Sequence, residues 1–289
     1  MKDDMVIGAI SGYNYEDIEP FVESLERSGY DGHKALLVYV GSKELIDKLE
    51  DKGWILFGHQ KDEEGGVTYQ NKDTFNICVD RFYHYWAFLK DQKDLRYVLS
   101  CDVKDVIFQR NPFDEETGLP SILRSHILCS GEGLKYKDEE WGWNNINLSF
   151  GPQISEEMAD REIVNAGVIA GWHHSMMDLF LHTFLVSRGA PYHVPGGGGP
   201  DQAAYNLVSR LFQRQDALEE DAWACQAGTT ADPRKIENFR PKLLDPEPVW
   251  DGEKVLNSKG EPYTIVHQYD RVPEWKEVLD HGYRSPSKV

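Results

Sequence analysis

The chain has 289 residues, 40% of them hydrophobic, which is enough for one sizeable core and too many for a disordered chain. Its formal charge is −18, with 49 acidic side chains against 31 Lys and Arg. This balance argues against nucleic acid or an anionic membrane as the main partner, because both select basic surfaces, but it allows a small phosphorylated ligand held by local cations and a metal.

The cysteines and the first residues indicate the compartment. The four cysteines are scattered and contain no Cys-x-x-Cys pair, so we expect reduced, buried thiols. The opening MKDDMVIG has acids where a secretory signal peptide needs a long apolar stretch, and no run approaches the ~18 apolar residues of a membrane span. The simplest interpretation is a soluble cytoplasmic protein.

The first part of the chain alternates strand and helix patterns. Short apolar, β-branched runs predict strands, and apolar residues at helical spacing predict helices. Ser42 is a plausible N-cap for the second helix. The expected strands are 5–10, 35–40, 54–57 and 97–100, and the expected helices are 15–28, 43–52 and 74–90.

The second part is less regular. A strand over 163–170 is interrupted at 165–167, and an apolar stripe over 176–185 indicates a helix. After a glycine-rich loop at 195–200, Asp201 begins a helix through Leu211. Residues 232–260 are turn-rich and are expected to be surface loops, followed by a strand at 265–268.

Strands separated by helices imply βαβ units, an α/β fold and a mainly parallel sheet. In such sheets ligands bind beyond the carboxyl ends of the strands. Asp102 and Asp105 follow the strand at 97–100, and the turn at 11–14 follows the first strand. A ligand site is therefore expected at this edge.

The most informative stretch is YVLSCDVKDVIFQRNPF at 97–113, which delivers two carboxylates to the edge of the core. Two buried acids are costly unless a metal with a phosphate, or an arginine, lies between them. Residues three apart on a strand point to opposite faces, so Asp102 and Asp105 can share an ion only if the strand ends near Cys101 and the chain turns. Alternatively, Asp102 caps a turn while Asp105 pairs with an arginine.

A strand ending in such an acid pair, followed by apolar residues and Asn111-Pro112-Phe113, resembles glycosyltransferases of the GT-A fold. The resemblance implies transfer of a sugar from a nucleotide-diphosphate donor, most simply a UDP-sugar, to a hydroxyl of a glycan, glycoconjugate or protein. In that family the acids hold Mn²⁺ or Mg²⁺, which bridges the donor's two phosphates.

Three later segments are similar to that family in chain order. Asn165-Ala166-Gly167 is similar to the strand that lines the donor-sugar pocket of retaining members, and Asp201-Gln202 to the helix start beside the sugar. His267 lies where those families keep a third metal ligand. The resemblance implies Asp201 and Gln202 as catalytic residues and a retaining reaction in which the leaving phosphate takes the acceptor's proton. If the enzyme inverts instead, Asp201 is the first candidate for general base.

Other positions complete the implied donor site. Arg81 resembles a basic residue that related enzymes aim at the donor, and base and ribose would dock at Ser11, Gly12 and Tyr13. A strict Asp-x-Asp has an acid where this chain has Lys104. Lys104 could instead neutralise the diphosphate directly, as metal-independent members do with basic side chains.

The expected organisation is a single GT-A-like domain over 1–289. Residues 1–113 form its nucleotide-binding half, 114–283 its sugar and acceptor half, and 284–289 a loose tail.

Structural interpretations of the same residues stay open. His267 can be a hydrogen-bonded core histidine, Asp201 a plain N-cap, and Arg81 a solvated or ion-paired helix residue. Trp141 and Trp143 offer either a carbohydrate-binding surface or an anchored surface loop. Two other functions also stay open: a sugar-nucleotide-binding module with impaired catalysis, and a metal-dependent phosphoesterase or nucleotidyltransferase.

Overall fold

The computed structural model describes residues 3–58, 60–67, 76–190, 198–212, 215–217 and 223–284. Expectations for Thr74 and Phe75, for the glycine-rich loop at 195–197 and for the tail at 285–289 lie outside these ranges. No helix in the described ranges is long and apolar enough to cross a membrane. None of the four cysteines forms a disulfide, and Cys101, Cys129 and Cys225 are buried, while Cys78 is half-buried.

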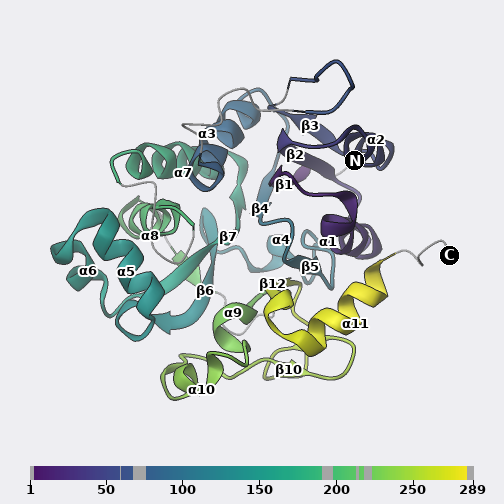
Figure 1. Cartoon of the computed structure of the whole chain (residues 1–289). Coiled ribbons are helices and arrows are strands. Elements are labelled where there is room, and N and C mark those ends of the chain that lie inside the picture. Colours follow the sequence, from purple (N-terminus) through teal and green to yellow (C-terminus); the bar gives the residue numbers. More distant parts are fainter. Residues whose placement is uncertain are drawn as a thin grey trace.

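The centre of the molecule is a seven-stranded sheet in the order β3-β2-β1-β4-β7-β6-β8 (Figure 1). The expected parallel sheet is confirmed, because β7 alone among these strands runs against the others. The strands span β1 (Asp4–Ser11), β2 (His33–Val40), β3 (Ile55–Phe57), β4 (Tyr97–Cys101), β6 (Ile127–Lys135), β7 (Glu162–Trp172) and β8 (Gln215–Ala217).

Helices cover both faces of this sheet, so the fold is a three-layer α/β/α arrangement (Figure 1). One face packs on α1 (Tyr15–Arg27) and α2 (Lys43–Asp51), and the Ser42 hydroxyl accepts the Leu45 N–H at 3.2 Å as the expected cap. The other face packs on α3 (Ile77–Leu89), α7 (His173–Ser187) and α8 (Asp201–Phe212).

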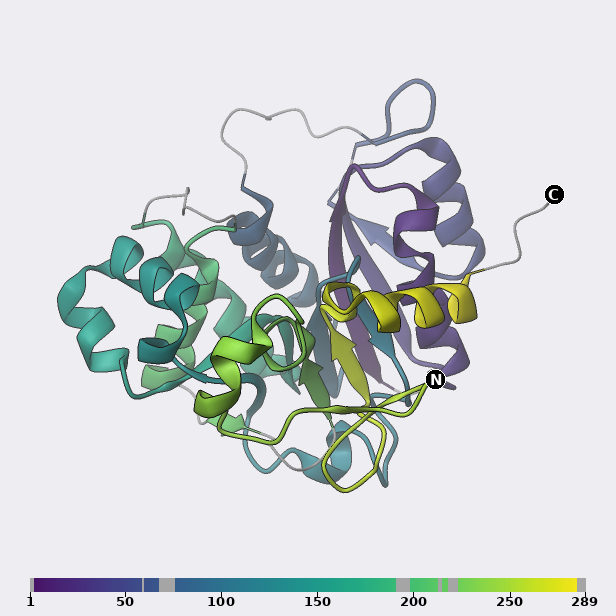
Figure 2. The same ribbon diagram turned by 60° about the horizontal axis from the view of Figure 1, so that its bottom comes forward.

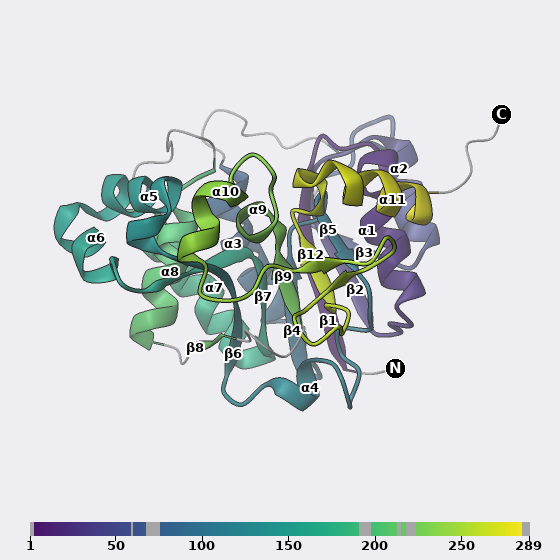
Figure 3. The same ribbon diagram turned by 90° about the horizontal axis from the view of Figure 1, so that it is seen from below.

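A second, three-stranded sheet lies beside the first (Figure 3). Its central strand is β12 (Ile265–His267), which pairs with β5 (Val106–Phe108) and β9 (Ala224–Gln226). A small apolar core joins this sheet to α11 (Pro273–Tyr283). The last strand of the chain is thereby placed directly beside the segment that follows β4.

The expectation of plain loops over 232–260 is wrong in part. This stretch contains α10 (Ile236–Phe239), the short 3-10 helix Arg240–Lys242 and the hairpin of β10 (Val249–Trp250) and β11 (Val255–Leu256). Each element is only two to four residues long, too short to show a hydrophobic period. The other short elements are α4 (Leu119–Ile122), α9 (Ala227–Thr230) and the 3-10 helices Tyr136–Asp138 and Tyr269–Arg271.

Two helices without a clear sequence pattern, α5 (Glu140–Phe150) and α6 (Pro152–Met158), pack beside α8 (Figure 2). The tryptophans expected either on a carbohydrate-binding surface or in a loop lie on α5. Glu139 caps this helix by accepting the Trp141 N–H at 3.2 Å. Gly151, with a φ of +85°, ends α5, and Pro152 begins α6 at a position where its missing N–H costs nothing.

The interruption expected in the strand at 163–170 is a bulge inside a continuous β7. Cys129 on β6 pairs with Ile169, whereas the next residue, Ser130, pairs with Asn165. Residues 166–168 therefore have no partner on β6, which frees their backbone groups for side chains from other elements.

Candidate functional site

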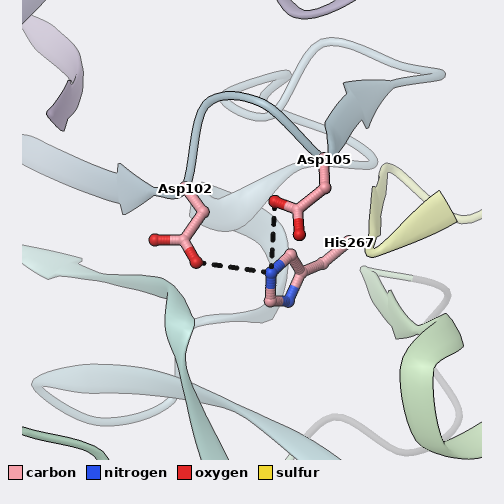
Figure 4. Close-up of side chains that lie close together, drawn as sticks. All are labelled: Asp102, Asp105 and His267. Atoms are coloured by element: carbon pink, nitrogen blue, oxygen red, sulfur yellow. Dashed lines mark ion pairs between the residues drawn. The ribbon is translucent and has the colours of Figure 1, made fainter. Parts of the chain in front are cut away.

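The acid pair lies on a tight turn between the two sheets. β4 ends at Cys101, the chain bends through Val103 and Lys104, and β5 begins at Val106. Val103 packs over Gly8, where an added Cβ would come within 2.6 Å of the valine side chain. The strand thus ends where the sequence argument required, and both carboxylates point to the same side (Figure 4).

His267 completes this cluster from β12. Its Nε2 lies 3.5 Å from Asp102 Oδ2 and 3.7 Å from Asp105 Oδ1. Its Nδ1 hydrogen-bonds Gln226 Oε1 at 2.7 Å, and because an amide oxygen only accepts, Nδ1 carries the proton. Within the described ranges the buried Nε2 has no hydrogen-bond partner, and it faces the two carboxylates.

The approach of His267 depends on Gly167 in the β7 bulge. A Cβ at this position would lie 2.4 Å from His267 Cε1 and 2.8 Å from its Nε2. The Gly167 carbonyl also accepts the Asp102 N–H at 2.8 Å. The absence of a side chain here lets the imidazole lie against β7 beside the carboxylates.

The electrostatics of the cluster separate the two acids. Burial would raise the pKa of Asp102, but Arg81 and His267 outweigh it and lower the pKa. Burial raises the pKa of Asp105, and the neighbouring Asp102 adds to this while His267 opposes it. Burial would lower the pKa of His267, but the two carboxylates raise it. Negative charge therefore dominates the space between the three side chains.

These residues fit a divalent cation. One ligand atom from each of Asp102, Asp105 and His267 lies within 4.8 Å of the others. A buried imidazole nitrogen without a partner is costly unless something accepts its lone pair, and a cation does so. Carboxylate oxygens with one imidazole suit Mn²⁺, and Mg²⁺ also takes carboxylate ligands.

Arg81 is buried behind the cluster. It donates to Asp102 Oδ1 at 2.5 Å, to the Ala166 carbonyl at 3.4 Å and to Asp201 Oδ2 at 3.5 Å. Among the alternatives, the ion-paired helix residue is the one observed. Arg81 joins the acid turn, the β7 bulge and the start of α8, while Asp102 Oδ2 still faces His267.

Asp201 begins α8 beside Arg81. Burial raises the pKa of Asp201 to about 6, although Arg81 opposes this. Asp201 is the first residue of α8 and not its N-cap, because the Pro200 carbonyl accepts the Ala204 N–H at 2.8 Å. The first turn of a helix favours a negative charge, so this position is compatible with a role at the site.

Gln202 and Asn165 use their amides within the protein. Gln202 accepts the Ala166 N–H at 2.8 Å and donates to the Val164 carbonyl at 3.0 Å and to Glu132 at 3.1 Å. Asn165 accepts the Gly167 N–H at 2.6 Å and donates to Glu132 at 2.7 Å. Both side chains hold the bulge in shape, and Gln202 would have to leave these partners to contact a sugar as expected.

Sequence reasoning missed Glu132. This β6 residue is 7% exposed, and its Oε1 accepts from both Asn165 and Gln202. Burial and the nearby Glu139 raise the pKa of Glu132 to about 7. The sequence offered only a glutamate between glycines (Ser130-Gly-Glu-Gly-Leu134) as an indication that the strand carries a buried acid there.

The residues expected to receive base and ribose lie at the end of β1. Tyr13 faces the acid turn, and the Lys104 ammonium lies 5.5 Å from the centre of its ring. Ser11 pairs with Val40, and Gly12 turns the chain with a φ of +72°. Lys104 is exposed and has no carboxylate within 4 Å among the described residues, so it is available to an anion.

A cleft of about 750 Å³ joins these groups, within the range of about 300–1,000 Å³ for small-molecule sites. All the candidate residues named from the sequence line it except Ser11 and Gly12. Of the two tryptophans named from the sequence, Trp141 lines it and Trp143 does not. Residues not named from the sequence also line it, among them Glu132, Glu139, Lys235 and Arg271.

Comparison with known proteins supports the fold. No protein-family model and no curated protein sequence matches the chain. Among solved structures, the chain is similar to the apo structure of WbbM, a bifunctional glycosyltransferase, with 12% identity and a TM-score of 0.53. The match covers 95% of this chain and 49% of WbbM, so the chain spans about half the length of that protein. The α/β fold is thus glycosyltransferase-like.

Proposed function

We propose that the chain is a glycosyltransferase that moves a sugar from a nucleotide-diphosphate donor, a UDP-sugar, to a hydroxyl of a glycan, glycoconjugate or protein acceptor. The observation that carries this proposal is the position of Asp102, Asp105 and His267 at the carboxyl ends of the strands, in a cleft of donor size. The glycosyltransferase-like fold supports it.

In this proposal the three side chains hold Mn²⁺ or Mg²⁺, which as a Lewis acid stabilises the negative charge of the leaving diphosphate. Lys104 contacts the diphosphate from the exposed side of the acid turn, and Tyr13 lies against the base or ribose. In this proposal the metal ion and the Lys104 ammonium both neutralise the diphosphate, whereas the sequence had suggested them as alternatives.

The residues around β7 orient the sugar. Arg81 fixes Asp102 and Asp201, while Gln202 and Asn165 fix the bulge on which the sugar lies. We retain the expectation of a retaining reaction, in which the enzyme holds acceptor and leaving phosphate on one face of the sugar. A site of this kind needs no strongly basic side chain.

Asp105→Asn tests the metal assignment. The substitution keeps the size of the side chain and removes one ligand charge, so Mn²⁺ affinity is expected to fall at least tenfold, and with it Mn²⁺-dependent UDP binding. Calorimetric titration with Mn²⁺ and then UDP measures both. Asp47→Asn, on the exposed face of α2, is the control. Metal-dependent UDP binding by Asp105→Asn equal to that of the natural protein would contradict the assignment.

A sugar-nucleotide-binding module with impaired catalysis is the second candidate, because Arg81 engages one oxygen of Asp102 and Lys104 replaces an expected acid. Donor hydrolysis across UDP-sugars in the presence of Mn²⁺ separates the two. UDP binding without release of free sugar favours the binding module, and no binding of UDP or GDP excludes both.

A further inference from the structure

Glu132 is a buried carboxylate that the metal cluster does not use. Its Oε1 is fixed by two amide donors, Asn165 Nδ2 at 2.7 Å and Gln202 Nε2 at 3.1 Å. Its Oε2 has no hydrogen-bond partner among the described residues, and Glu132 lines the cleft. A carboxylate oxygen that is held in place and has no donor is preorganised to accept a hydrogen bond from a hydroxyl of a ligand.

The position of Glu132 relates it to the sugar. Asn165 links it to the Gly167 N–H, which lies against His267 of the metal cluster. Gln202 links it to the start of α8. The strand order β1-β4-β7-β6 places Glu132 across β7 from Asp102, on the opposite side to Tyr13, which follows β1. The transferred sugar would lie on the Glu132 side if the diphosphate is at the metal.

Glu132 has a second acid beside it, and two basic groups also act on it. Glu139 faces it from the start of α5, and His267 and Lys235 are the basic groups that act on it. Glu139 uses its carboxylate to cap α5, and Asp201 lines the same cleft. A second carboxylate brought here by a ligand would be repelled at short range in a poorly solvated site.

We propose that Glu132 binds a hydroxyl of the transferred sugar through its free Oε2 and restricts the donor to uncharged sugars, such as hexoses and N-acetylhexosamines, against uronic acids. The inference rests on the proposed function. It assigns the specificity of the same cleft to a residue outside the metal cluster, with Asn165 and Gln202 as the groups that position it.

Two matched pairs of donors test the proposal: UDP-glucose against UDP-glucuronic acid, and UDP-galactose against UDP-galacturonic acid, each with UDP alone as reference. The members of a pair differ only in the carboxylate at C6. The natural protein with Mn²⁺ is expected to bind the uncharged member of at least one pair at least tenfold more tightly than the acid, by calorimetric titration.

In Glu132→Gln the affinity for UDP is expected to stay within twofold of the natural value, and the affinity for the uncharged UDP-sugar is expected to fall about tenfold. The ratio between the affinities for the uncharged UDP-sugar and the UDP-uronic acid should become smaller. Glu132→Asp keeps the charge but moves the carboxylate back by the length of one methylene. Its affinity for the uncharged UDP-sugar should therefore fall, while its affinity for the UDP-uronic acid should stay low. Glu157→Gln, exposed on α6, is the control.

The outcomes are distinguishable. Loss of UDP and UDP-sugar affinity by the same factor in both Glu132 variants would show that Glu132 supports the fold or the nucleotide, and would overturn the inference. Unchanged donor affinities would overturn it too. If the natural protein binds no UDP with Mn²⁺, the proposed function itself fails and the inference with it.

Discussion

At the scale of single residues, both burial and neighbouring charges separate the acids of the site. The pKa of Asp102, whose side chain is 35% exposed, is lowered because Arg81 and His267 outweigh its burial. Burial raises the pKa of the more enclosed Asp201 to about 6 and that of Glu132 to about 7. Each raised pKa measures how strongly the folded chain resists a negative charge at that point. When ionised, Asp201 and Glu132 are therefore expected to lower the free energy of unfolding of the protein without its ligand.

Glu132→Gln is expected to stabilise the protein at pH 8 and to have a much smaller effect on its stability at pH 5. The pKa of Glu132 rises from 4.5 to about 7 on folding, so the folded chain binds the proton of this side chain more tightly than the unfolded chain does. The stability that this proton contributes is lost as the pH rises from 4.5 through 7. The shift corresponds to about 3 kcal/mol. A neutral amide avoids that loss, so Tm at pH 8 should rise by on the order of 5 °C.

Thermal unfolding followed by circular dichroism at pH 5 and pH 8 measures this difference, without Mn²⁺ or UDP. The exposed Glu157→Gln should unfold like the natural protein at both values. A Glu132→Gln variant less stable than the natural protein at pH 8 would show that the carboxylate stabilises the bulge by more than its burial costs.

At the scale of elements, the β7 bulge is the centre of the site. Its residues supply the carbonyl bound by Arg81, the N–H bound by Gln202 and the space occupied by His267. One irregularity in one strand thus joins α3, α8 and β12. Bulges beside functional sites commonly direct side chains in this way.

Gly167→Ala tests the bulge. The added Cβ would lie too close to both His267 and Asn165, so the imidazole must move and Mn²⁺ affinity should fall at least tenfold. Stability should fall by about 1–3 kcal/mol, as in other overpacked sites. Calorimetric Mn²⁺ titration and urea unfolding measure the two effects. Gly282→Ala, where an added Cβ meets nothing within 4 Å, is the control. Mn²⁺ binding at the natural affinity would mean that His267 is not a ligand.

The sequence predicted the strands and helices whose pattern is local. The β4 run and the apolar stripe of α7 lie where expected, because each buries a continuous face. The turn that brings Asp102 and Asp105 together followed from strand geometry. Glu132 and the register shift at Ser130 could not be predicted, because a bulge depends on the partner strand and the raised pKa depends on burial by distant segments.

At the scale of the whole molecule, the charge of −18 opposes the ligand that the cleft is proposed to bind. A nucleoside diphosphate is an anion, so attraction must come from the bound metal and from nearby cations such as Lys104, while the rest of the protein repels it. Salt screens long-range repulsion more than close contacts.

The association rate of UDP in the presence of Mn²⁺ is therefore expected to increase as NaCl is raised from 20 to 200 mM, by about twofold or more. This is the opposite of the dependence shown by proteins with basic phosphate-binding surfaces. Stopped-flow mixing followed by tryptophan fluorescence measures the rate, with potassium acetate in place of NaCl as the control for chloride. A rate that falls steeply with either salt would show that local cations dominate the approach.

His267 lies on β12, near the end of the described chain, whereas the carboxylates it faces follow β4. During synthesis on the ribosome, the sheet and both acids can be in place long before the imidazole emerges. The nascent protein therefore passes through a stage in which it carries the acids but cannot form the complete metal cluster. Cation binding at the proposed site would therefore follow the folding of β12 against the acid turn, and it would report that this contact between distant segments has formed.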